Sequence, residues 1–416
     1  MLEYVKAKVA EYAIVLSWIE QELQKIDTER SDHHQLIIRL QSRLVEAQKL
    51  HDQLKTLARI GNARLLRRAF PILHELEYVA FLLTSNYVPA LQKEGEADRF
   101  LGQLVLATMR KCGLNWIKDT IVQLSGAHAI ITGSSLVEIP LIFAPPQHAA
   151  SFSDMPGLYH ELGHNVFERF QSIADELSMT VTQHFAQFRK KAGPITPEQR
   201  YERDRSINDA IDYWGRERLN EIFCDIFATF VCGPAHYVSC VDMGLRDDRD
   251  PFWIEDGDVH PPLSARVYAC YRSLSPGHRK ERVVMAVHTA WRGHERLRTG
   301  NGVFDLVCSS VLMDRLVETS IRCIEQVLPT LKRYSRSLSQ DKNIEQVSPE
   351  SSLEDILNWG THLLYTQSEG YASWERDLFR ELGWCTAEND FSKSIQTRIL
   401  LSSCTEVVHS ACVYSR

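Results

Sequence analysis

The sequence predicts an α+β fold that is predominantly α-helical, with long helical regions on both sides of a small sheet. Apolar residues recur every three or four positions over most of the chain, whereas short β-branched segments occur only near residues 129–143. The 416 residues are 44% apolar and 24% charged, which is typical of a globular chain with two or three domains. We therefore predict three regions: residues 1–120, 121–300 and 301–416.

The charge and cysteine content exclude several classes of protein. The net charge is −7, from 47 basic and 54 acidic residues, whereas a dedicated nucleic-acid-binding protein is normally basic. No apolar run reaches the roughly 18–20 residues of a membrane span, and the N-terminus lacks the layout of a signal peptide. The ten cysteines form no CxxC pair. We expect no nucleic-acid partner, no membrane span, and a cytoplasmic protein whose thiols are mostly free and buried.

The first region begins with two candidate helices that predict a hairpin. The first carries a coiled-coil seam with spacings of three and four, and the second carries a single apolar stripe. A polar joint at residues 27–34 separates them, with Ser31 or Asp32 as a candidate cap. The hairpin could be an arm for self-association or for a partner protein, but packing on its own domain is slightly favoured. The seam consists of Leu2, Val5, Val9, Tyr12, Leu16, Ile19, Leu23 and Ile26, and the stripe of Ile37, Leu40, Leu44, Ala47 and Leu54.

Helical periodicity continues to about residue 124 and is then replaced by two candidate strands, at residues 129–132 and 136–143. Pro140 favours an edge position for the second strand, because proline cannot donate a hydrogen bond to a neighbouring strand. Helical patterns dominate again from about 155 to 235, from 304 to 334 and from 353 to 382. A polar, Asp-rich loop covers about 244–262, and a Ser- and Gln-rich tract at 337–352 is a candidate linker.

The strongest functional signal is the HExxH motif at His160-Glu161-Leu-Gly-His164. On a helix, residues four apart lie on one face, so both imidazoles can reach one metal ion. Glu161 would then act on a water molecule at the open side of the ion. Asp154 is a candidate cap for this helix, and Pro156 suits its first turn.

A downstream helix, from about Leu219 to Phe230, supplies the expected third ligand. It is largely apolar, yet it carries Glu221 and Asp225 one turn apart. Buried carboxylates are costly without partners. A metal ion for Glu221 and an imidazole N–H for Asp225 would satisfy both, whereas the alternative is an ordinary surface helix with a spaced acidic pair.

The third element is His260-Pro-Pro-Leu-Ser-Ala-Arg266. The order HExxH, ExxxD and HPPxxxR resembles gluzincin peptidases of the HtpX and CAAX prenyl-protease type over about residues 125–275. This resemblance implies a zincin-like metalloprotease core, here as a soluble variant without a membrane span. The HELGH segment alone also resembles the soluble ImmA/IrrE regulatory proteases, but their third ligand usually lies closer to the HExxH motif than Glu221 does.

The resemblance assigns roles to the remaining residues. His160, His164 and Glu221 would bind Zn²⁺, and Glu161 would be the general base. Asp225 would orient a ligating histidine, and Arg266 would brace the buried carboxylates. His260 would lie near the site as a further catalytic residue that donates to the oxyanion. Apart from the resemblance, Tyr237 and His236 follow the Glu221 helix and could supply another donor, although a packed tyrosine at a helix end is the favoured alternative. An edge strand at residues 137–143 would pair with an extended peptide substrate, although an internal strand is an open alternative.

The sequence thus predicts a zinc metallopeptidase that hydrolyses peptide bonds. The alternative from another class is a non-catalytic or latent metalloprotein in which the helical arms act as an interaction or sensor scaffold. An intact Glu161 argues against a pure scaffold, because a scaffold has no need of the base.

Overall fold

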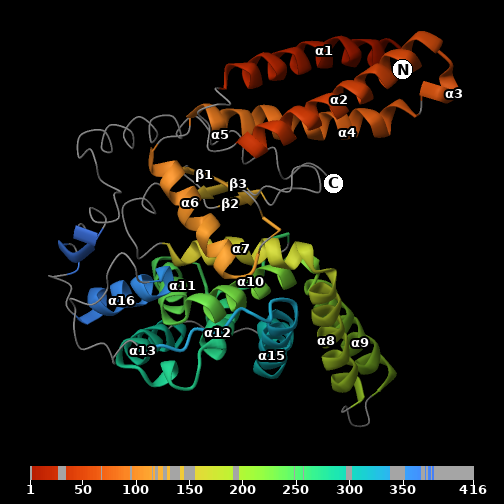
Figure 1. Cartoon of the computed structure of the whole chain (residues 1–416). Coiled ribbons are helices and arrows are strands. Elements are labelled where there is room, and N and C mark those ends of the chain that lie inside the picture. The colour runs from red at the N-terminus through yellow and green to blue at the C-terminus, as the bar shows by residue number, and fades with distance from the viewer. Residues whose placement is uncertain are drawn as a thin grey trace. The chain divides into compact units, whose positions relative to one another are not determined.

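A computed structural model of the chain describes the residues on which the candidate site depends (Figure 1). The described residues are 2–26, 34–66, 68–93, 96–114, 116–117, 120–124, 129–131, 141–144, 155–190, 196–247, 249–255, 257–296, 302–337, 352–366, 371, 373–375 and 377–378. They fold into two compact units. The N-terminal unit comprises Met1–Ala107 and Asn115–Pro145, and the C-terminal unit comprises Thr108–Leu114 and Pro146–Arg416.

Helices dominate both units, as the sequence predicts, but the division of the chain differs from the three predicted regions. The strands belong with the N-terminal helices, and the C-terminal helices belong with the HExxH helix. In the N-terminal unit the helices are α1 (Leu2–Lys25), α2 (His34–Ile60), α3 (Ala63–Leu66), α4 (Ala69–Phe81), the π-helix η1 (Leu82–Tyr87), α5 (Val88–Lys93) and most of α6 (Glu96–Lys111).

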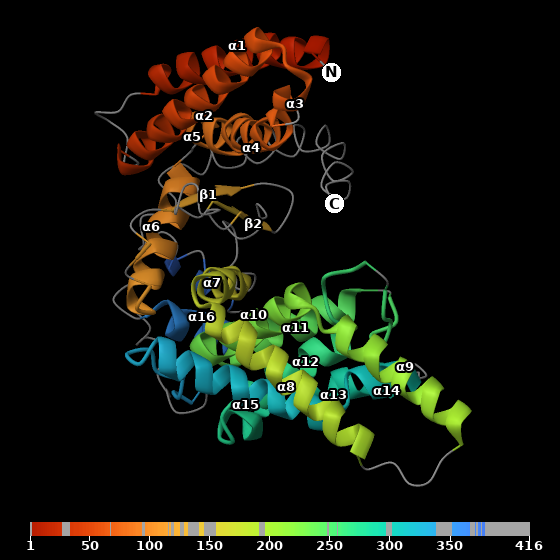
Figure 2. The ribbon, with the colours of Figure 1, turned by 90° about the vertical axis from the view of Figure 1, so that its right-hand side faces the viewer.

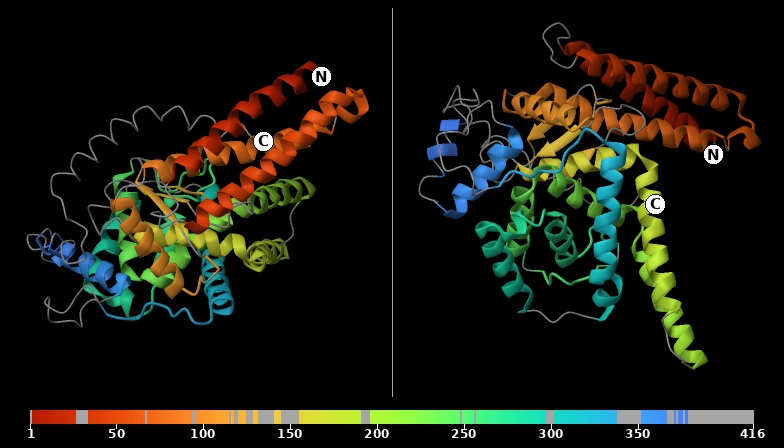
Figure 3. Two further views of the ribbon diagram at one scale, coloured as in Figure 1. Left: turned by 45° about the horizontal axis from the view of Figure 1, so that its top comes forward. Right: turned by 60° about the horizontal axis from the view of Figure 1, so that its bottom comes forward.

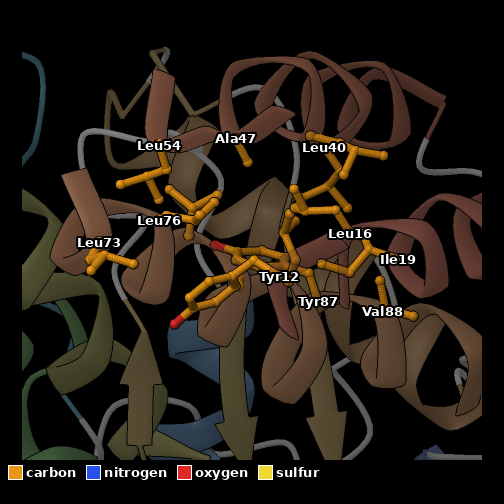
Figure 4. Packing of buried hydrophobic residues seen from close by; sticks show 14 of the residues in the cluster. Tyr12, Leu16, Ile19, Leu40, Ala47, Leu54, Leu73, Leu76, Tyr87 and Val88 are labelled. Carbon is orange, nitrogen blue, oxygen red and sulfur yellow. The ribbon is translucent and has the colours of Figure 1, made fainter. Parts of the chain in front are cut away.

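The predicted hairpin is formed by α1 and α2, which lie side by side in Figures 1 and 3. His51, late in α2, bonds through Nε2 to the carbonyl oxygen of Val9, early in α1, at 2.7 Å, so the two helices run antiparallel. The seam does not remain open for another chain. It forms one core with residues of α4, η1 and α5 (Figure 4). Ser31 and Asp32, the candidate caps, lie outside the described residues.

The hairpin core allows a direct stability test at Leu40, which is completely buried among these helices. We expect Leu40→Ala to lower the free energy of unfolding by about 2–5 kcal/mol, because it removes buried methyl groups and leaves a cavity. Ile38→Ala is the matched control, since 45% of Ile38 is exposed on the same helix, and it should change stability by less than about 0.5 kcal/mol. Urea denaturation followed by circular dichroism measures both. Equal losses would contradict the packing described here.

The three described strands form one sheet in the order β1-β3-β2. They are β1 (Ile121–Leu124), β2 (Ala129–Ile131) and β3 (Leu141–Ala144), with β3 parallel to β1 and antiparallel to β2. The predicted edge strand at residues 137–143 is therefore wrong for its described part. β3 has a hydrogen-bonded neighbour on each side, so its backbone is not free to pair with a peptide. Pro140, which suggested the edge position, lies outside the described residues.

The C-terminal unit is built from helices. They are α7 (Pro156–Arg169), α8 (Gln171–Lys190), α9 (Pro197–Tyr213), α10 (Arg216–Cys232), α11 (Pro234–Arg246), α12 (Leu263–Ser273), the 3₁₀-helix η4 (His278–Lys280), α13 (Arg282–Arg296), α14 (Gly302–Val307), α15 (Ser310–Val327) and α16 (Leu353–Thr366). Figure 2 shows α8 and α15 running beside each other, and α10 lies against α7, α8, α11, α12, α15 and α16. Every residue from Glu221 to Cys232 is buried, so α10 is the central helix of this unit.

The C-terminal helices belong to this unit because specific hydrogen bonds connect them to α10 and its flanks. The indole N–H of Trp214 donates to the carbonyl oxygen of Val307 at 2.8 Å. The Tyr334 N–H donates to the Phe230 carbonyl oxygen at 2.9 Å, and the Asn358 amide donates to the Cys232 carbonyl oxygen at 2.6 Å. The last two bonds satisfy carbonyl groups at the C-terminal end of α10, and the first connects α14 to the segment that precedes α10. These connections explain why residues beyond 301 form no separate unit.

Two further expectations have outcomes within the described residues. Seven cysteines are free and buried there, as predicted; they are Cys112, Cys224, Cys232, Cys240, Cys270, Cys308 and Cys323. Among the helices that the structure describes, none has the length and apolar character needed to cross a membrane.

Candidate metal centre

The HExxH motif lies on α7, which begins at Pro156 as predicted. The N-cap residue of α7 is Met155, and its side chain forms no capping hydrogen bond. Asp154, the candidate cap, lies outside the described residues. His160 and His164 are one helical turn apart, and their ring centres are separated by 5.0 Å. His160 Nδ1 donates to Asp225 Oδ1 at 2.9 Å, and His164 Nδ1 donates to Asn220 Oδ1 at 3.1 Å. In the neutral form of each ring, a proton held on Nδ1 leaves Nε2 with a lone pair that can bind a metal ion.

Glu221 brings a carboxylate to both of these nitrogen atoms. Its Oε2 lies 3.2 Å from His160 Nε2, and its Oε1 lies 3.6 Å from His164 Nε2. Glu221 is only 8% exposed, and its Oε2 atom has no hydrogen-bond partner in the described part of the chain. A buried carboxylate oxygen without a partner is costly. A cation placed between the two imidazoles and this carboxylate would satisfy it.

The charges of the site also suit a divalent cation. Glu161, Glu221 and Asp225 supply three buried carboxylates, whereas Arg266 supplies one guanidinium. With neutral imidazoles, this set carries an excess of negative charge in a buried environment. A bound dication would compensate it, and two imidazoles with one carboxylate are a typical catalytic zinc set.

The close approach of α7 and α10 depends on Gly163. A Cβ atom added at this position would lie 2.8 Å from the Cα atom of Cys224, so any side chain would collide with the α10 backbone. Gly163 lies between the two histidines in sequence, and Cys224 lies between Glu221 and Asp225. The small residue at the helix crossing therefore allows the histidines and the carboxylates to meet.

Asp225 connects His160 to a buried guanidinium. The side chain of Asp225 is 1% exposed, and it accepts hydrogen bonds from Arg266 Nε at 2.7 Å and Arg266 Nη2 at 2.9 Å. Arg266, on α12, thus compensates the charge of Asp225 and fixes its orientation. Asp225 would orient His160, and Arg266 would brace Asp225, through these contacts; both roles stay predictions.

Burial and neighbouring charges shift the ionisation of the site. Burial alone would lower the pKa of His160, but Asp225 and Glu221 raise it to about 10. Burial, followed by the charge of His160, lowers the pKa of His164 to about 4. Burial opposes ionisation of Glu221, yet His160 and Arg266 lower the pKa of Glu221 to about 2. Even without a metal ion, the carboxylates thus favour a positive charge between them.

Glu161 differs from Glu221 in this respect. It is buried beside the histidines, and burial raises the pKa of its carboxyl group above the ordinary value. A carboxylate whose proton affinity is raised is a better proton acceptor near neutral pH than an exposed one. The environment of Glu161 therefore suits a group that takes up and releases a proton.

His260 lies where the sequence places it, beside the carboxylate of Glu221. Its Nε2 atom is 3.6 Å from Glu221 Oε2, and its side chain is 51% exposed. Asp258 holds this imidazole, because its Oδ1 accepts hydrogen bonds from both the backbone N–H and Nδ1 of His260 at 2.9 Å. His260 thus faces the site from the solvent side.

Tyr237 does not lie where the sequence-based hypothesis requires. It is fully buried, and its hydroxyl bonds to His288 Nδ1 at 2.9 Å in a cluster with Tyr271. The preceding residue, His236, is the one that faces the site. Its Nε2 lies 3.8 Å from Asp225 Oδ1, and its Nδ1 is 3.3 Å from the carbonyl oxygen of Pro156 at the start of α7.

Sequence reasoning missed Asn220 and Asp258, and it named His236 only together with Tyr237. The signal for Asn220 and Asp258 is the requirement that each functional imidazole has a partner for its Nδ1 proton. Asn220 directly precedes Glu221, and Asp258 lies two residues before His260. No sequence pattern distinguishes His236 from Tyr237, because only the direction in which α11 leaves α10 decides which of them faces Asp225.

Two groups of potential ligand atoms converge within 4.8 Å in the described part of the chain: His160, His164 and Cys224, and His160, Asp225 and His236. In the second group, the carboxylate oxygens of Asp225 already accept hydrogen bonds from Arg266 and from His160 Nδ1, so they are not available to a metal ion. In the first, the Cys224 thiol donates to Asn220 Oδ1 at 3.3 Å, and burial raises its pKa. Glu221 is therefore the better third ligand, because it is charged and its Oε2 lacks a partner.

Comparison with protein-family models, curated proteins and solved structures gives no match for this chain.

Proposed function

We propose that this chain is a zinc-dependent peptidase with a zincin-like centre on α7 and α10. The observation that carries the proposal is the convergence of His160 Nε2, His164 Nε2 and the unpartnered carboxylate oxygen of Glu221. Two imidazoles and a carboxylate leave a fourth position free, which is the arrangement of catalytic zinc. A peptide or protein substrate and a cytoplasmic location complete the proposal.

Each residue of the site has a task in hydrolysis. Bound zinc would acidify a water molecule and polarise the carbonyl group of the substrate. Glu161 would accept the proton of the attacking water and transfer it to the departing amine. His260, held by Asp258 at the exposed side, would donate to the oxygen that becomes negative. Asp225 and Arg266 would keep the imidazole of His160 in its ligating orientation.

Zinc stoichiometry tests the centre. We expect about one zinc per chain in the wild type purified without chelating resin. Glu221→Ala should lose most of it, because two imidazoles alone bind zinc weakly. Glu217→Ala is the matched control, since Glu217 is exposed on the same helix. Cys224→Ala distinguishes the two candidate third ligands and should retain the metal.

Plasma emission spectrometry on the four proteins gives the answer. A folded wild type that binds no zinc after reloading would overturn the proposal. Loss of zinc in Cys224→Ala together with retention in Glu221→Ala would instead assign the third position to the thiol.

A further inference from the structure

A cavity of about 200 Å³ adjoins the candidate metal centre in the C-terminal unit. His260 and Arg266 line it, and both also contact the centre: His260 Nε2 lies 3.6 Å from Glu221 Oε2, and Arg266 binds Asp225. The cavity is smaller than the roughly 300–1,000 Å³ of a pocket for a whole small molecule. Its size instead suits one side chain of a peptide that extends past the centre.

We propose that this cavity binds the cationic side chain of a lysine or arginine in a peptide substrate. The proposal rests on the proposed function, because it assigns a side-chain preference to the same site.

The walls of the cavity combine an aromatic face with aliphatic surface. Trp253 lines it with 59% of its surface exposed, and Met243, Leu263 and the two prolines after His260 add apolar contacts. An exposed tryptophan beside a reaction centre is free to receive a ligand. The stem of a lysine or arginine can pack on such surface, and its charge is attracted to the face of an indole ring.

The charge of the cavity selects a cation. Four carboxylates line it, from Asp247, Asp250, Glu255 and Asp258, against the guanidinium groups of Arg249 and Arg266. Four of these six charged groups already have a partner: Asp247 and Arg249 bind each other at 2.8 Å, Asp258 binds His260, and Arg266 binds Asp225.

Asp250 and Glu255 remain. Neither forms an ion pair within 4.0 Å among the residues that the structure describes, and Glu255 is exposed to solvent. Asp250 Oδ1 accepts a hydrogen bond from the backbone N–H of Phe252 at 2.9 Å, and no cationic side chain among the described residues is paired with this carboxylate. A guanidinium or ammonium group entering beside Trp253 would meet this negative potential.

The loop that forms the cavity is held in place before any ligand arrives. The Pro251 carbonyl oxygen accepts a hydrogen bond from the Ser264 N–H at 2.9 Å. The Phe252 ring packs edge-on against Phe304, with centres 4.9 Å apart. These contacts fix the two residues that directly precede Trp253. The cavity is therefore largely formed before a ligand binds, which lowers the free-energy cost of binding.

Peptide binding measures the preference without requiring cleavage. The full chain carrying Glu161→Gln is titrated with two dye-labelled octapeptides. Each consists of alanine except at the fourth position, which is arginine in one peptide and norleucine in the other. The uniform background lets the single long side chain choose its register. At 50 mM salt we expect the arginine peptide to bind about tenfold more tightly, since a cation against carboxylates and an indole face gains on this order.

Two variants and a control locate the preference. Glu255→Gln and Trp253→Ala, each in the Glu161→Gln background, should reduce the preference below about threefold. Glu217→Gln, which removes an exposed charge from α10 away from the cavity, should leave it unchanged. Equal affinity of the two peptides for the parent protein, or an undiminished preference in both cavity variants, would overturn the proposal.

Zinc content, measured on the same samples, separates the two proposals. If the protein binds zinc but shows no arginine preference, the cation-binding role of the cavity is refuted and the peptidase proposal stands. An arginine preference that disappears in both cavity variants, in a protein that binds no zinc, would support the cavity and refute the metal centre.

Discussion

Replacing Glu161 by glutamine should reduce peptide hydrolysis by about 10²–10⁴-fold while the zinc content stays at the wild-type level. Glutamine keeps the size of the side chain but cannot accept the proton of the attacking water, and general acid–base catalysis contributes about 10²–10⁴-fold. Glu161 is not among the proposed ligands, so the metal should remain. Cleavage of a quenched-fluorescence peptide library, with lysine- and arginine-containing members, measures the rate.

The matched control for this variant is Glu168→Gln. Glu168 is on the same helix, and its side chain is 46% exposed and paired with Arg216. We expect a rate within twofold of wild type, because a surface ion pair is worth about 0–1 kcal/mol and lies outside the centre. A Glu161→Gln protein that cleaves as fast as wild type would show that Glu161 is not the base. Wild-type protein that binds zinc but cleaves no library member would favour the latent or scaffold alternative.

The proposed ligand residues could be found from the sequence, because metal chemistry constrains both spacing and burial. His160 and His164 are four apart on a helix, and Glu221 and Asp225 are carboxylates on a helix that is otherwise apolar. A buried carboxylate requires a partner, and a metal ion for Glu221 with an imidazole N–H for Asp225 is one arrangement that satisfies both. The structure brings these four residues together over 65 positions of sequence, from His160 to Asp225.

The remainder of the site was not predictable, because it depends on helix directions. The angle between α10 and α11 decides whether His236 or Tyr237 faces Asp225. Gly233, with a φ of 68°, connects the two helices and sets this angle. The central position of β3 could not be deduced from Pro140 either, because it depends on which strands pair with β3 on its two sides. Sequence periodicity specifies the type of an element and its buried face, but not its neighbours.

The N-terminal hairpin illustrates the same limit. Its seam predicts that two helices pack, and the structure places them antiparallel with α4 against the seam. The periodicity alone is equally compatible with a seam that binds a second chain. Because Val5, Leu16 and Ile19 are buried within one chain, the seam itself is unavailable, and any self-association would have to use other faces of these helices.

Asp225→Asn should lower the free energy of unfolding of the metal-free protein by about 3–5 kcal/mol. The change removes one charge of a buried, doubly hydrogen-bonded pair and leaves the Arg266 guanidinium buried without compensation. The same variant should weaken zinc binding by about 10–100-fold, because His160 loses the carboxylate that orients it and raises its basicity. Urea denaturation in the presence of a chelator measures the first effect, and competition with a zinc indicator measures the second.

The double variant Asp225→Asn with Arg266→Met decides whether the ion pair is the cause. If the cost of Asp225→Asn comes from the uncompensated guanidinium, removal of that charge should recover part of the stability, so the double variant should lose less than the sum of the single variants. Zinc affinity should not recover with it, because methionine cannot restore the carboxylate on His160. Strictly additive stability losses would contradict the coupling. Recovery of stability without recovery of zinc binding would separate the two tasks of Asp225, which compensates Arg266 on one side and orients the imidazole of His160 on the other.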